Sequence, residues 1–269
     1  MKSYEQGVPV PAGPLLVGFD VEWTKNYQRK NANRAFCFSL VWVRAEPPGD
    51  LQMLERTLDF GFWLCYSEAE EECELLCHEA NRCVKQLLAQ ENVVVGHQFS
   101  SDVSVLLACS EETLPAIELL QQCWRSRQHP LEPQAVSVFD TRYDLPTSKN
   151  GQSNKLVHVC PAWNLIVTQP EIKGSMTKMQ REFYQHHALL ILEQIAVLNL
   201  RHSLSSVLLY LFHRFGCPSY PVNINAILHR NLAAQFEYVR SARFASLLTD
   251  ISQERQTLRS SVAFPVLTS

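Results

Sequence analysis

Two acidic residues lie two positions apart in an otherwise apolar stretch, LLVGFDVEW, at residues 15–23. The stretch is typical of a buried strand, and because side chains alternate across a strand, Asp20 and Glu22 share one face. Two carboxylates this close repel each other unless a cation or a shared proton balances their charge. The pair therefore indicates a cation site, although an edge strand with two solvated acids fits the same pattern.

A third carboxylate is expected close to this pair. In VVVGHQFSSDVSVLL a buried strand leads through a loop into a helix, and Asp102 lies in the first turn of that helix. Acids are also common at helix starts for purely structural reasons. Sites in α/β sheets, however, form where strands end and helices begin. The next expected strand, in VSVFDT, ends on Asp140 in the same way.

Hydrophobic patterning predicts the elements that position these acids. Strands are expected at residues 15–23, 34–43, 58–66, 92–97 and 135–140, and helices at residues 67–90, from about 100, and at 111–124, 175–197, 203–215 and 223–248. A meander of antiparallel strands followed by strand–helix crossovers predicts an α/β fold, with a mixed sheet and helices on both of its faces. We expect an N-terminal arm at 1–14, a main domain at 15–215 and a helical C-terminal extension at 216–269.

Composition narrows the class of protein. The chain has 269 residues, 46% of them hydrophobic, and a net charge of −3, so any contact with nucleic acid must come from a local basic patch. The N-terminal residues lack the apolar core of a signal peptide, and no run approaches the ~20 apolar residues of a membrane span. We expect a soluble, cytoplasmic or otherwise intracellular protein with no membrane contact.

The cysteines fit a reducing compartment. There are nine, an odd number, and they are scattered along the chain, which favours free thiols over a disulfide framework. Cys73, Cys77 and Cys83 fall within one expected helix, with His78 between them. Because zinc ligands usually come from loops at tighter spacing, we expect these cysteines to be small apolar helix residues and not metal ligands.

Three motifs occur in a meaningful order: FDVEW, GHQFSSD and VFDT. They resemble the motifs of the DEDD exonuclease superfamily, whose 3′–5′ proofreading domains have the ribonuclease H-like fold. The later segment EIKGSMTKMQREFYQHHALLILEQIAVLN is similar to the last exonuclease motif of family B DNA polymerases and their stand-alone relatives. The resemblance covers roughly residues 15 to 215.

This resemblance implies roles for named residues. Asp20, Glu22 and Asp102 match the metal-binding acids of the family, and Gln98 stands where an asparagine is usual. Phe183 matches the aromatic residue of the last motif, and the aspartate expected four positions later falls on His187. The family hydrolyses phosphodiesters at 3′ ends with two divalent ions about 3.5–4 Å apart. Mg²⁺ or Mn²⁺ is therefore the expected cofactor, and an imidazole in the fourth position favours manganese.

The expected partner is a nucleic acid with a single-stranded 3′ end. The residues expected to contact it are Lys25, Tyr27, Arg29, Lys30, Gln98, Phe99, Lys173 and Phe183. The C-terminal helices offer a surface for a protein partner. Two functions stay open at this point: a metal-dependent 3′–5′ exonuclease acting on DNA or RNA, and an inactive relative that binds nucleic acid or a partner protein. The missing fourth acid favours the second function, and the three acids that match the motifs of the family favour the first.

Overall fold

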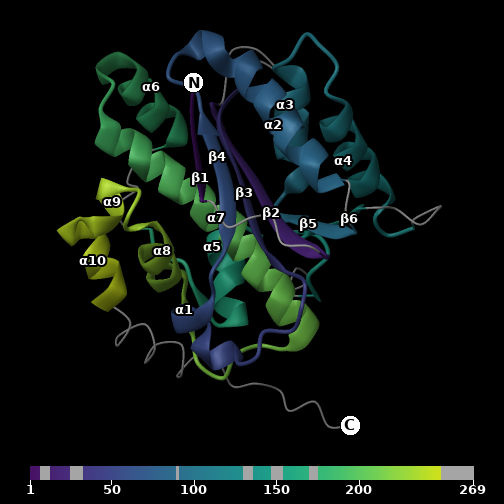
Figure 1. Cartoon of the computed structure of the whole chain (residues 1–269), viewed down its shortest axis with the longest axis vertical. Coiled ribbons are helices and arrows are strands. Elements are labelled where there is room, and N and C mark those ends of the chain that lie inside the picture. Colours follow the sequence, from purple (N-terminus) through teal and green to yellow (C-terminus); the bar gives the residue numbers. More distant parts are fainter. Residues whose placement is uncertain are drawn as a thin grey trace.

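A six-stranded mixed sheet forms the centre of the molecule (Figure 1). The computed structural model describes residues 1–6, 13–24, 33–88, 91–129, 136–146, 154–169 and 175–249. Within these ranges the strand order is β1-β4-β3-β2-β5-β6. The strands are β1 (Lys2–Gln6), β2 (Leu15–Thr24), β3 (Arg34–Arg44), β4 (Gly61–Tyr66), β5 (Asn92–Gly96) and β6 (Val136–Asp140). The first four strands pair antiparallel, and β2, β5 and β6 pair in parallel.

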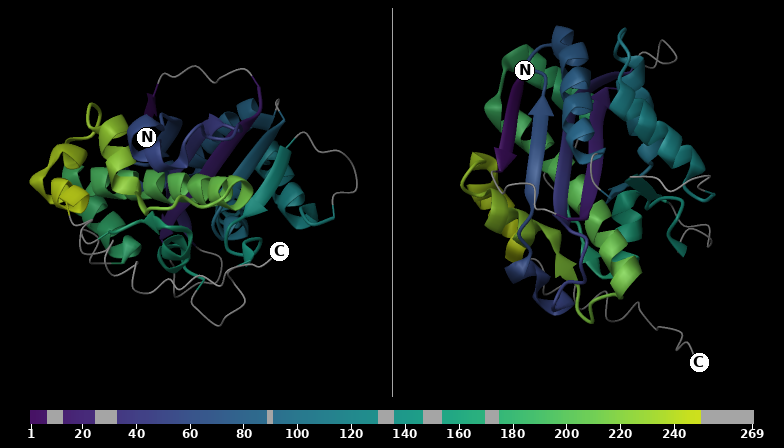
Figure 2. Two further views of the ribbon diagram at one scale, coloured as in Figure 1. Left: turned by 90° about the horizontal axis from the view of Figure 1, so that it is seen from below. Right: turned by 45° about the vertical axis from the view of Figure 1, so that its right-hand side comes forward.

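Helices cover both faces of this sheet (Figure 2). On one face lie α2 (Cys73–Leu88), α3 (Phe99–Ala108) and α4 (Pro115–Ser126), and on the other lies the long helix α7 (Leu189–Phe215). Around α7 pack α5 (Leu156–Val159), α6 (Met176–His186), α8 (Ile224–Leu232), α9 (Glu237–Arg240) and α10 (Ala242–Thr249). Each face of the sheet thus has its own apolar cluster, as a sheet buried on both sides requires.

Strand β2 contributes to both clusters because its side chains alternate. Val17, Phe19 and Val21 join the cluster formed with α2, α3 and α4, whereas Leu16 joins the cluster formed with α7. The even-numbered residues of β2 therefore face α7. This orientation decides which helix the acids of β2 meet.

The expected fold class is confirmed: the molecule is an α/β protein with a mixed sheet flanked by helices, an arrangement compatible with a ribonuclease H-like fold. Two expectations differ from the structure. Residues 2–6 of the expected N-terminal arm form β1, which pairs with β4 at the sheet edge. The expected loop after residue 140 contains α5 and a short strand, β7 (Leu165–Ile166), which pairs with β8 (Val222–Asn223).

The helical region after residue 175 is also divided differently. The break expected near residue 200 lies at His187 and Ala188, and α7 then runs without interruption for 27 residues. His187 adopts the left-handed conformation (φ 48°) that ends α6. The hydrophobic periodicity of the sequence around His187 does not indicate this turn. The shift changes which histidine faces the acids.

Helix α7 is long and apolar enough to cross a membrane by length and composition, with a mean hydropathy of 1.4 over its most apolar window. That window is 89% buried inside the fold. Its side chains are covered by the sheet on one side and by the surrounding helices on the other. The burial of α7 is therefore typical of the core helix of a soluble protein.

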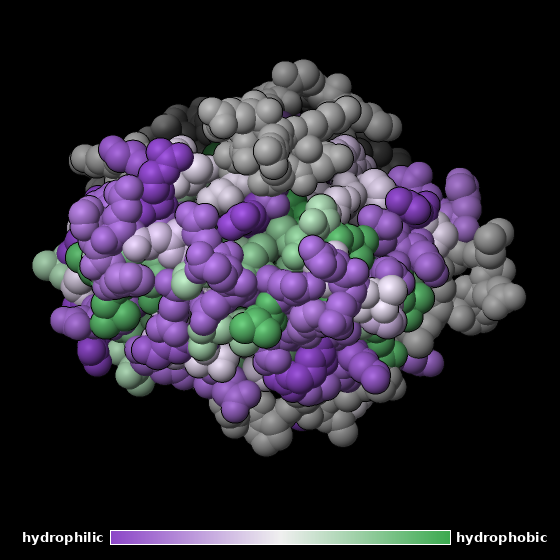
Figure 3. Space-filling view, turned by 90° about the horizontal axis from the view of Figure 1, so that it is seen from above, coloured by the Kyte–Doolittle hydropathy of each residue, from purple (hydrophilic) through white to green (hydrophobic). Residues whose placement is uncertain are grey.

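The outer surface is more polar than this interior. On the face shown in Figure 3, hydrophilic residues predominate and hydrophobic residues appear in small patches between them. The large hydrophobic side chains that are exposed include Leu75 of α2, Leu119 of α4 and the adjacent pair Leu189 and Leu190 at the start of α7. Single exposed hydrophobic residues are normal on a protein surface.

Candidate metal centre

Strand β2 directs Asp20 and Glu22 toward α7. Both side chains are largely buried, with 12% and 13% of their surface exposed. Gly18, two residues earlier on the same face, allows the close approach of the helix. A Cβ at Gly18 would overlap the backbone carbonyl of Ser203, so only glycine lets α7 pack this tightly against β2. The Ser203 hydroxyl also hydrogen-bonds Ser39 of β3 at 2.7 Å.

Helix α7 places two polar residues, one turn apart, in contact with the two acids. Asn199 donates a 2.7 Å hydrogen bond from Nδ2 to Oδ2 of Asp20. The Nδ1 atom of His202 lies 3.1 Å from Oε1 of Glu22 and 3.5 Å from Oδ2 of Asp20. Possible ligand atoms of Asp20, Glu22 and His202 all lie within 4.8 Å of one another. The fold thus gathers two carboxylates and one imidazole into a compact group.

Asp102 reaches the same place from α3. It lies in the first turn of that helix and is buried, and its Oδ1 atom accepts a hydrogen bond of 3.3 Å from Nε1 of Trp23. A cavity of about 320 Å³ opens in front of these groups. Its lining comprises Asp20, Val21, Glu22, Trp23, His97, Gln98, Ser101, Asp102, Leu156, Met176 and His202. The three acids that the sequence singled out therefore share one cavity.

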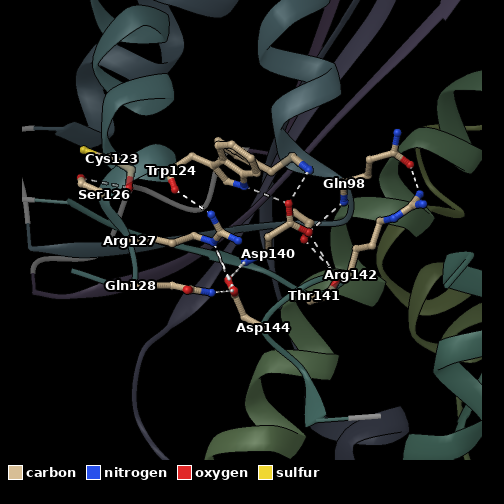
Figure 4. Close-up of polar contacts among 12 residues, drawn as sticks. Gln98, Cys123, Trp124, Ser126, Arg127, Gln128, Asp140, Thr141, Arg142 and Asp144 are labelled. Atoms are coloured by element: carbon tan, nitrogen blue, oxygen red, sulfur yellow. Dashed lines mark hydrogen bonds and ion pairs between the residues drawn. The ribbon is translucent and has the colours of Figure 1, made fainter. Parts of the chain in front are cut away.

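A separate polar network holds the turn between β5 and α3 (Figure 4). The carboxylate of Asp140 accepts hydrogen bonds from the backbone N–H groups of Gln98, Phe99 and Arg142, at 3.0 Å each, and from Nε1 of Trp124 at 2.9 Å. Burial raises the pKa of Asp140, and these donors oppose the rise. The network fixes Gln98 in its left-handed conformation (φ 62°) and sets the start of α3. Asp140 thereby positions Asp102 without lining the cavity itself.

The cavity gathers acidic side chains in a buried place, and their pKa values are shifted. Burial raises the pKa of Asp20 to about 6, with a further rise from Glu22, while His202 and Asn199 oppose it. Burial also raises the pKa of Asp102 well above its usual range, and the neighbouring charges of Asp20 and Glu22 add to the effect. Burial disfavours a charged His202, but the two carboxylates outweigh it and raise the pKa of His202 to about 10. The acids thus attract a cation strongly enough to keep a buried imidazole protonated.

The donor set suits a divalent ion. Oε1 of Glu22 is buried and has no hydrogen-bond partner among the described residues, although Nδ1 of His202 lies 3.1 Å from it. Buried carboxylate oxygens normally have a hydrogen-bond partner. This oxygen therefore has a lone pair that could bind a metal ion. Carboxylate oxygens are the ligands that Mg²⁺ and Mn²⁺ prefer, and an imidazole favours Mn²⁺ over Mg²⁺. Asp20, Glu22 and a neutral His202 could together hold such an ion, and Asp102 lines the same cavity.

His97 forms another wall of the cavity. Its Nε2 atom lies 2.8 Å from the backbone carbonyl oxygen of Asn154, which it reaches as a donor, and Nδ1 lies 3.0 Å from the hydroxyl of Thr141. Burial lowers the pKa of His97 to about 4, so the ring is neutral at pH 7. The cavity therefore holds two histidines of opposite character, one neutral and one cationic.

Several predicted site residues lie elsewhere. His187 caps the end of α6, is exposed and packs against the ring of Phe183; it was wrong as the fourth metal-site residue, because the helix break falls at this position. Phe183 and Phe99 are buried in the two apolar clusters. Neither ring is available to stack on a base. Gln98 does line the cavity, with Ser101 and Arg142 bound to its amide.

The remaining predicted contacts with nucleic acid cannot be placed. Lys25, Tyr27, Arg29, Lys30 and Lys173 lie outside the described residues. Glu193, the next acid along α7, is buried and accepts a 2.6 Å hydrogen bond from the backbone N–H of Tyr238. Glu193 therefore links α7 to the C-terminal helices and is not among the residues that line the cavity.

Sequence reasoning missed Asn199 and His202. A signal for them exists in the sequence ALLILEQIAVLNLRHSLSSVLLYLF, where Asn199, His202 and Ser203 interrupt a long apolar helix at helical spacing. Polar residues spaced three and four apart share one helix face. Such a stripe in a buried helix calls for a polar partner, which β2 supplies.

Comparisons of the chain with protein-family models, with curated proteins and with solved structures found no match.

Proposed function

We propose that this protein is a divalent-metal-dependent nuclease that hydrolyses the phosphodiester at the 3′ end of a nucleic acid, a 3′–5′ exonuclease. The observation that carries the proposal is the convergence of Asp20, Glu22 and Asp102 on one cavity, beside a sheet of ribonuclease H-like arrangement. Buried acids that repel one another are costly. Binding a divalent ion gives that arrangement a function as well as a charge balance.

The metal would be held by residues of three elements. Asp20 and Glu22 of β2 and Asp102 of α3 would provide oxygen ligands, and His202 of α7 the nitrogen. A bound divalent ion supplies Lewis-acid activation of water and neutralises charge on the phosphodiester. Asn199 orients Asp20 through its hydrogen bond, and Trp23 orients Asp102 in the same way. The protein thus holds its ligands in place before the ion arrives.

His202 would also hold a proton when no ion is present. Its Nδ1 lies between the carboxylates of Asp20 and Glu22, where the ring compensates their charge. Metal ligands must be deprotonated, so binding of an ion at His202 releases a proton. The neutral His97 faces the same cavity. Its lowered pKa makes it a weaker base near neutral pH than a usual general base.

A second function has an observation in its favour. His202 and Asn199 bring no fourth negative charge to the cavity, and His202 already balances the two acids of β2. A protein with this arrangement could bind nucleic acid or a partner protein through a site that no longer cleaves. The two functions differ in whether metal ions stimulate product formation.

The test is incubation of the purified protein with 5′-labelled single-stranded DNA and RNA, in Mg²⁺ and then in Mn²⁺. The proposal predicts a ladder shortened from the 3′ end, faster in Mn²⁺, and blocked by a 3′-phosphate. Asp20→Asn should lower the rate by ~10²–10³, the range observed when one preorganised charged group is lost. The matched control is Glu118→Gln, which alters an exposed acid of α4 and should leave the rate unchanged.

Three other results would count against cleavage by this site. Equal rates in Asp20→Asn and the wild type would indicate a contaminating nuclease. A ladder that ignores the 3′-phosphate would indicate internal cleavage. Binding of the oligonucleotide without any product in either metal would support the second function.

A further inference from the structure

Three cysteine thiols converge on the opposite side of the sheet from α7. Cys73 and Cys77 lie one turn apart on α2, and Cys109 follows the last residue of α3. The three Sγ atoms lie within 4.8 Å of one another. Cys77 is fully buried and Cys73 nearly so, whereas Cys109 is partly exposed. All nine cysteines of the chain are free thiols in the structure.

We propose that Cys73, Cys77 and Cys109 bind one soft, thiolate-seeking cation of the Zn²⁺ or Cu⁺ class. Nothing in the sequence joins Cys109 to the other two, because it lies 32 positions after Cys77. The fold brings it there by placing α2 and α3 on the same face of the sheet. The expectation that Cys73, Cys77 and Cys83 are ordinary apolar residues considered the thiols of one helix, and the fold adds a thiol from another element.

The spacing of the sulfurs suits such an ion. Zinc binds thiolates at about 2.3 Å, so sulfurs at tetrahedral corners lie about 3.8 Å apart, and trigonal ligands of a similar bond length lie about 4 Å apart. The observed limit of 4.8 Å therefore requires only small side-chain rotations. Soft thiolate ligands select Zn²⁺ and Cu⁺ over Mg²⁺ or Mn²⁺. The cluster and the carboxylate cavity would consequently take different metals.

The surroundings of Cys109 provide support and access. Its Sγ atom accepts a 3.4 Å hydrogen bond from the backbone N–H of Ala35 and lies 3.1 Å from the carbonyl oxygen of Asn33. Hydrogen bonds from backbone N–H groups are typical outer support for metal thiolates. The partial exposure of Cys109 leaves a route for the ion, and a solvent water or the Asn33 carbonyl could complete a fourth position.

Ordinary core packing is the competing explanation, since buried free cysteines behave as small hydrophobes. Packing accounts for Cys83, which is buried on the same helix. It does not require thiols from two separate elements to place their sulfur atoms together. Ligation involves no change of oxidation state: each participating thiol releases its proton to solvent as its sulfur bonds the cation.

The test is titration of the reduced, metal-free full-length chain with Co²⁺, whose bonds to thiolates give charge-transfer absorption in the near ultraviolet. The proposal predicts one equivalent of Co²⁺ with this absorption, and its displacement by Zn²⁺. A second titration uses Cu⁺ in competition with a coloured Cu⁺ chelator. Binding of either ion at one equivalent supports the proposal and identifies the preferred ion.

Variants decide whether the three cysteines are the ligands. Cys109→Ala changes a partly exposed position at a helix end and should fold; it should weaken binding at least tenfold. Cys83→Ala removes a thiol of α2 outside the cluster and should bind as the wild type does. Asp102→Asn should also keep the thiolate absorption, which separates this site from the carboxylate cavity. Unchanged binding in Cys109→Ala, or no binding of either ion by protein whose thiols are verified as reduced, would overturn the proposal.

Discussion

Two sets of buried carboxylates lie near one another in this molecule and differ in their hydrogen-bond partners: Asp140 by itself, and Asp20 with Glu22 and Asp102. Asp140, at the end of β6, accepts four hydrogen bonds from N–H groups around it (Figure 4). Asp20, Glu22 and Asp102 face a cavity instead. Among the described residues, Oε1 of Glu22 lies 3.1 Å from Nδ1 of His202 without forming a hydrogen bond, and Oδ1 of Asp102 accepts one hydrogen bond of 3.3 Å from the indole N–H of Trp23.

This difference separates a structural acid from a candidate ligand. A carboxylate whose oxygens are filled by protein donors has no lone pair directed at a ligand and serves to hold backbone in place. A carboxylate buried beside others, with an oxygen left over, costs stability unless something outside the protein pairs with it. The two groups can therefore be told apart by how substitution changes stability and metal response.

The largest effect is expected at the structural acid. Asp140→Ala removes the acceptor of four N–H donors, one in a buried and three in partly buried hydrogen bonds. A fully buried group left unpaired costs about 1–3 kcal/mol, and a partly buried one costs less because water can reach it. The free energy of unfolding, measured with urea, should fall by about 3–5 kcal/mol. Asp140→Asn keeps one acceptor oxygen and should lose less. A loss under about 1 kcal/mol for Asp140→Ala would show that these bonds do not hold the turn.

A smaller effect is expected when the same substitution is made at two histidines. His202→Asp adds a carboxylate beside Asp20 and Glu22 and should raise Mg²⁺-dependent cleavage of a 3′ end by about tenfold or more. His187→Asp is the matched control, because His187 is exposed at the end of α6 and aspartate tolerates its left-handed conformation. It should leave the rate unchanged. Equal effects of the two substitutions would break the assignment of His202.

These two histidines also show how far the sequence could predict the site. Strand alternation was enough to place Asp20 and Glu22 on one face, and the strand–loop–helix pattern placed Asp102 near them. Locating the imidazole required the exact phase of α7 and the close approach permitted by Gly18. Those depend on a helix break at His187, which hydrophobic periodicity does not register. The motif alignment across that break led to His187, which is exposed at the end of α6 and is not among the residues that line the cavity.

The fold was more predictable than the site for a related reason. Five of the six sheet strands coincide with apolar runs rich in β-branched and aromatic residues. The sixth, β1, has the polar sequence KSYEQ and is defined by its pairing with β4, which no local pattern encodes. The convergence of Cys109 with the thiols of α2 is likewise a result of helix packing.

The smallest effect concerns the pH dependence of stability in metal-free protein. Burial and the neighbouring acids raise the pKa of Asp102, so the folded protein keeps a proton that the unfolded chain releases as pH rises above about 4. Stability due to this group therefore falls with rising pH. Asp102→Asn removes that contribution, and the variant should be about 1 kcal/mol more stable than the wild type at pH 7 without metal. The gain should vanish near pH 3 in urea titrations. A variant less stable at pH 7 would mean that the carboxylate is satisfied within the fold.

The central claim is that the cavity between β2, α3 and α7 binds a divalent cation, and calorimetric titration with Mn²⁺ tests it most directly. Because thiolates prefer softer ions, the Mn²⁺ signal reports on the carboxylates. The account predicts Mn²⁺ binding to the wild type and to Glu118→Gln, tighter than Mg²⁺ binding, strengthened as pH rises because the proton on His202 must leave, and weakened at least tenfold in Asp102→Asn. Absence of Mn²⁺ binding to the wild type, or equal binding in Asp102→Asn, would contradict it.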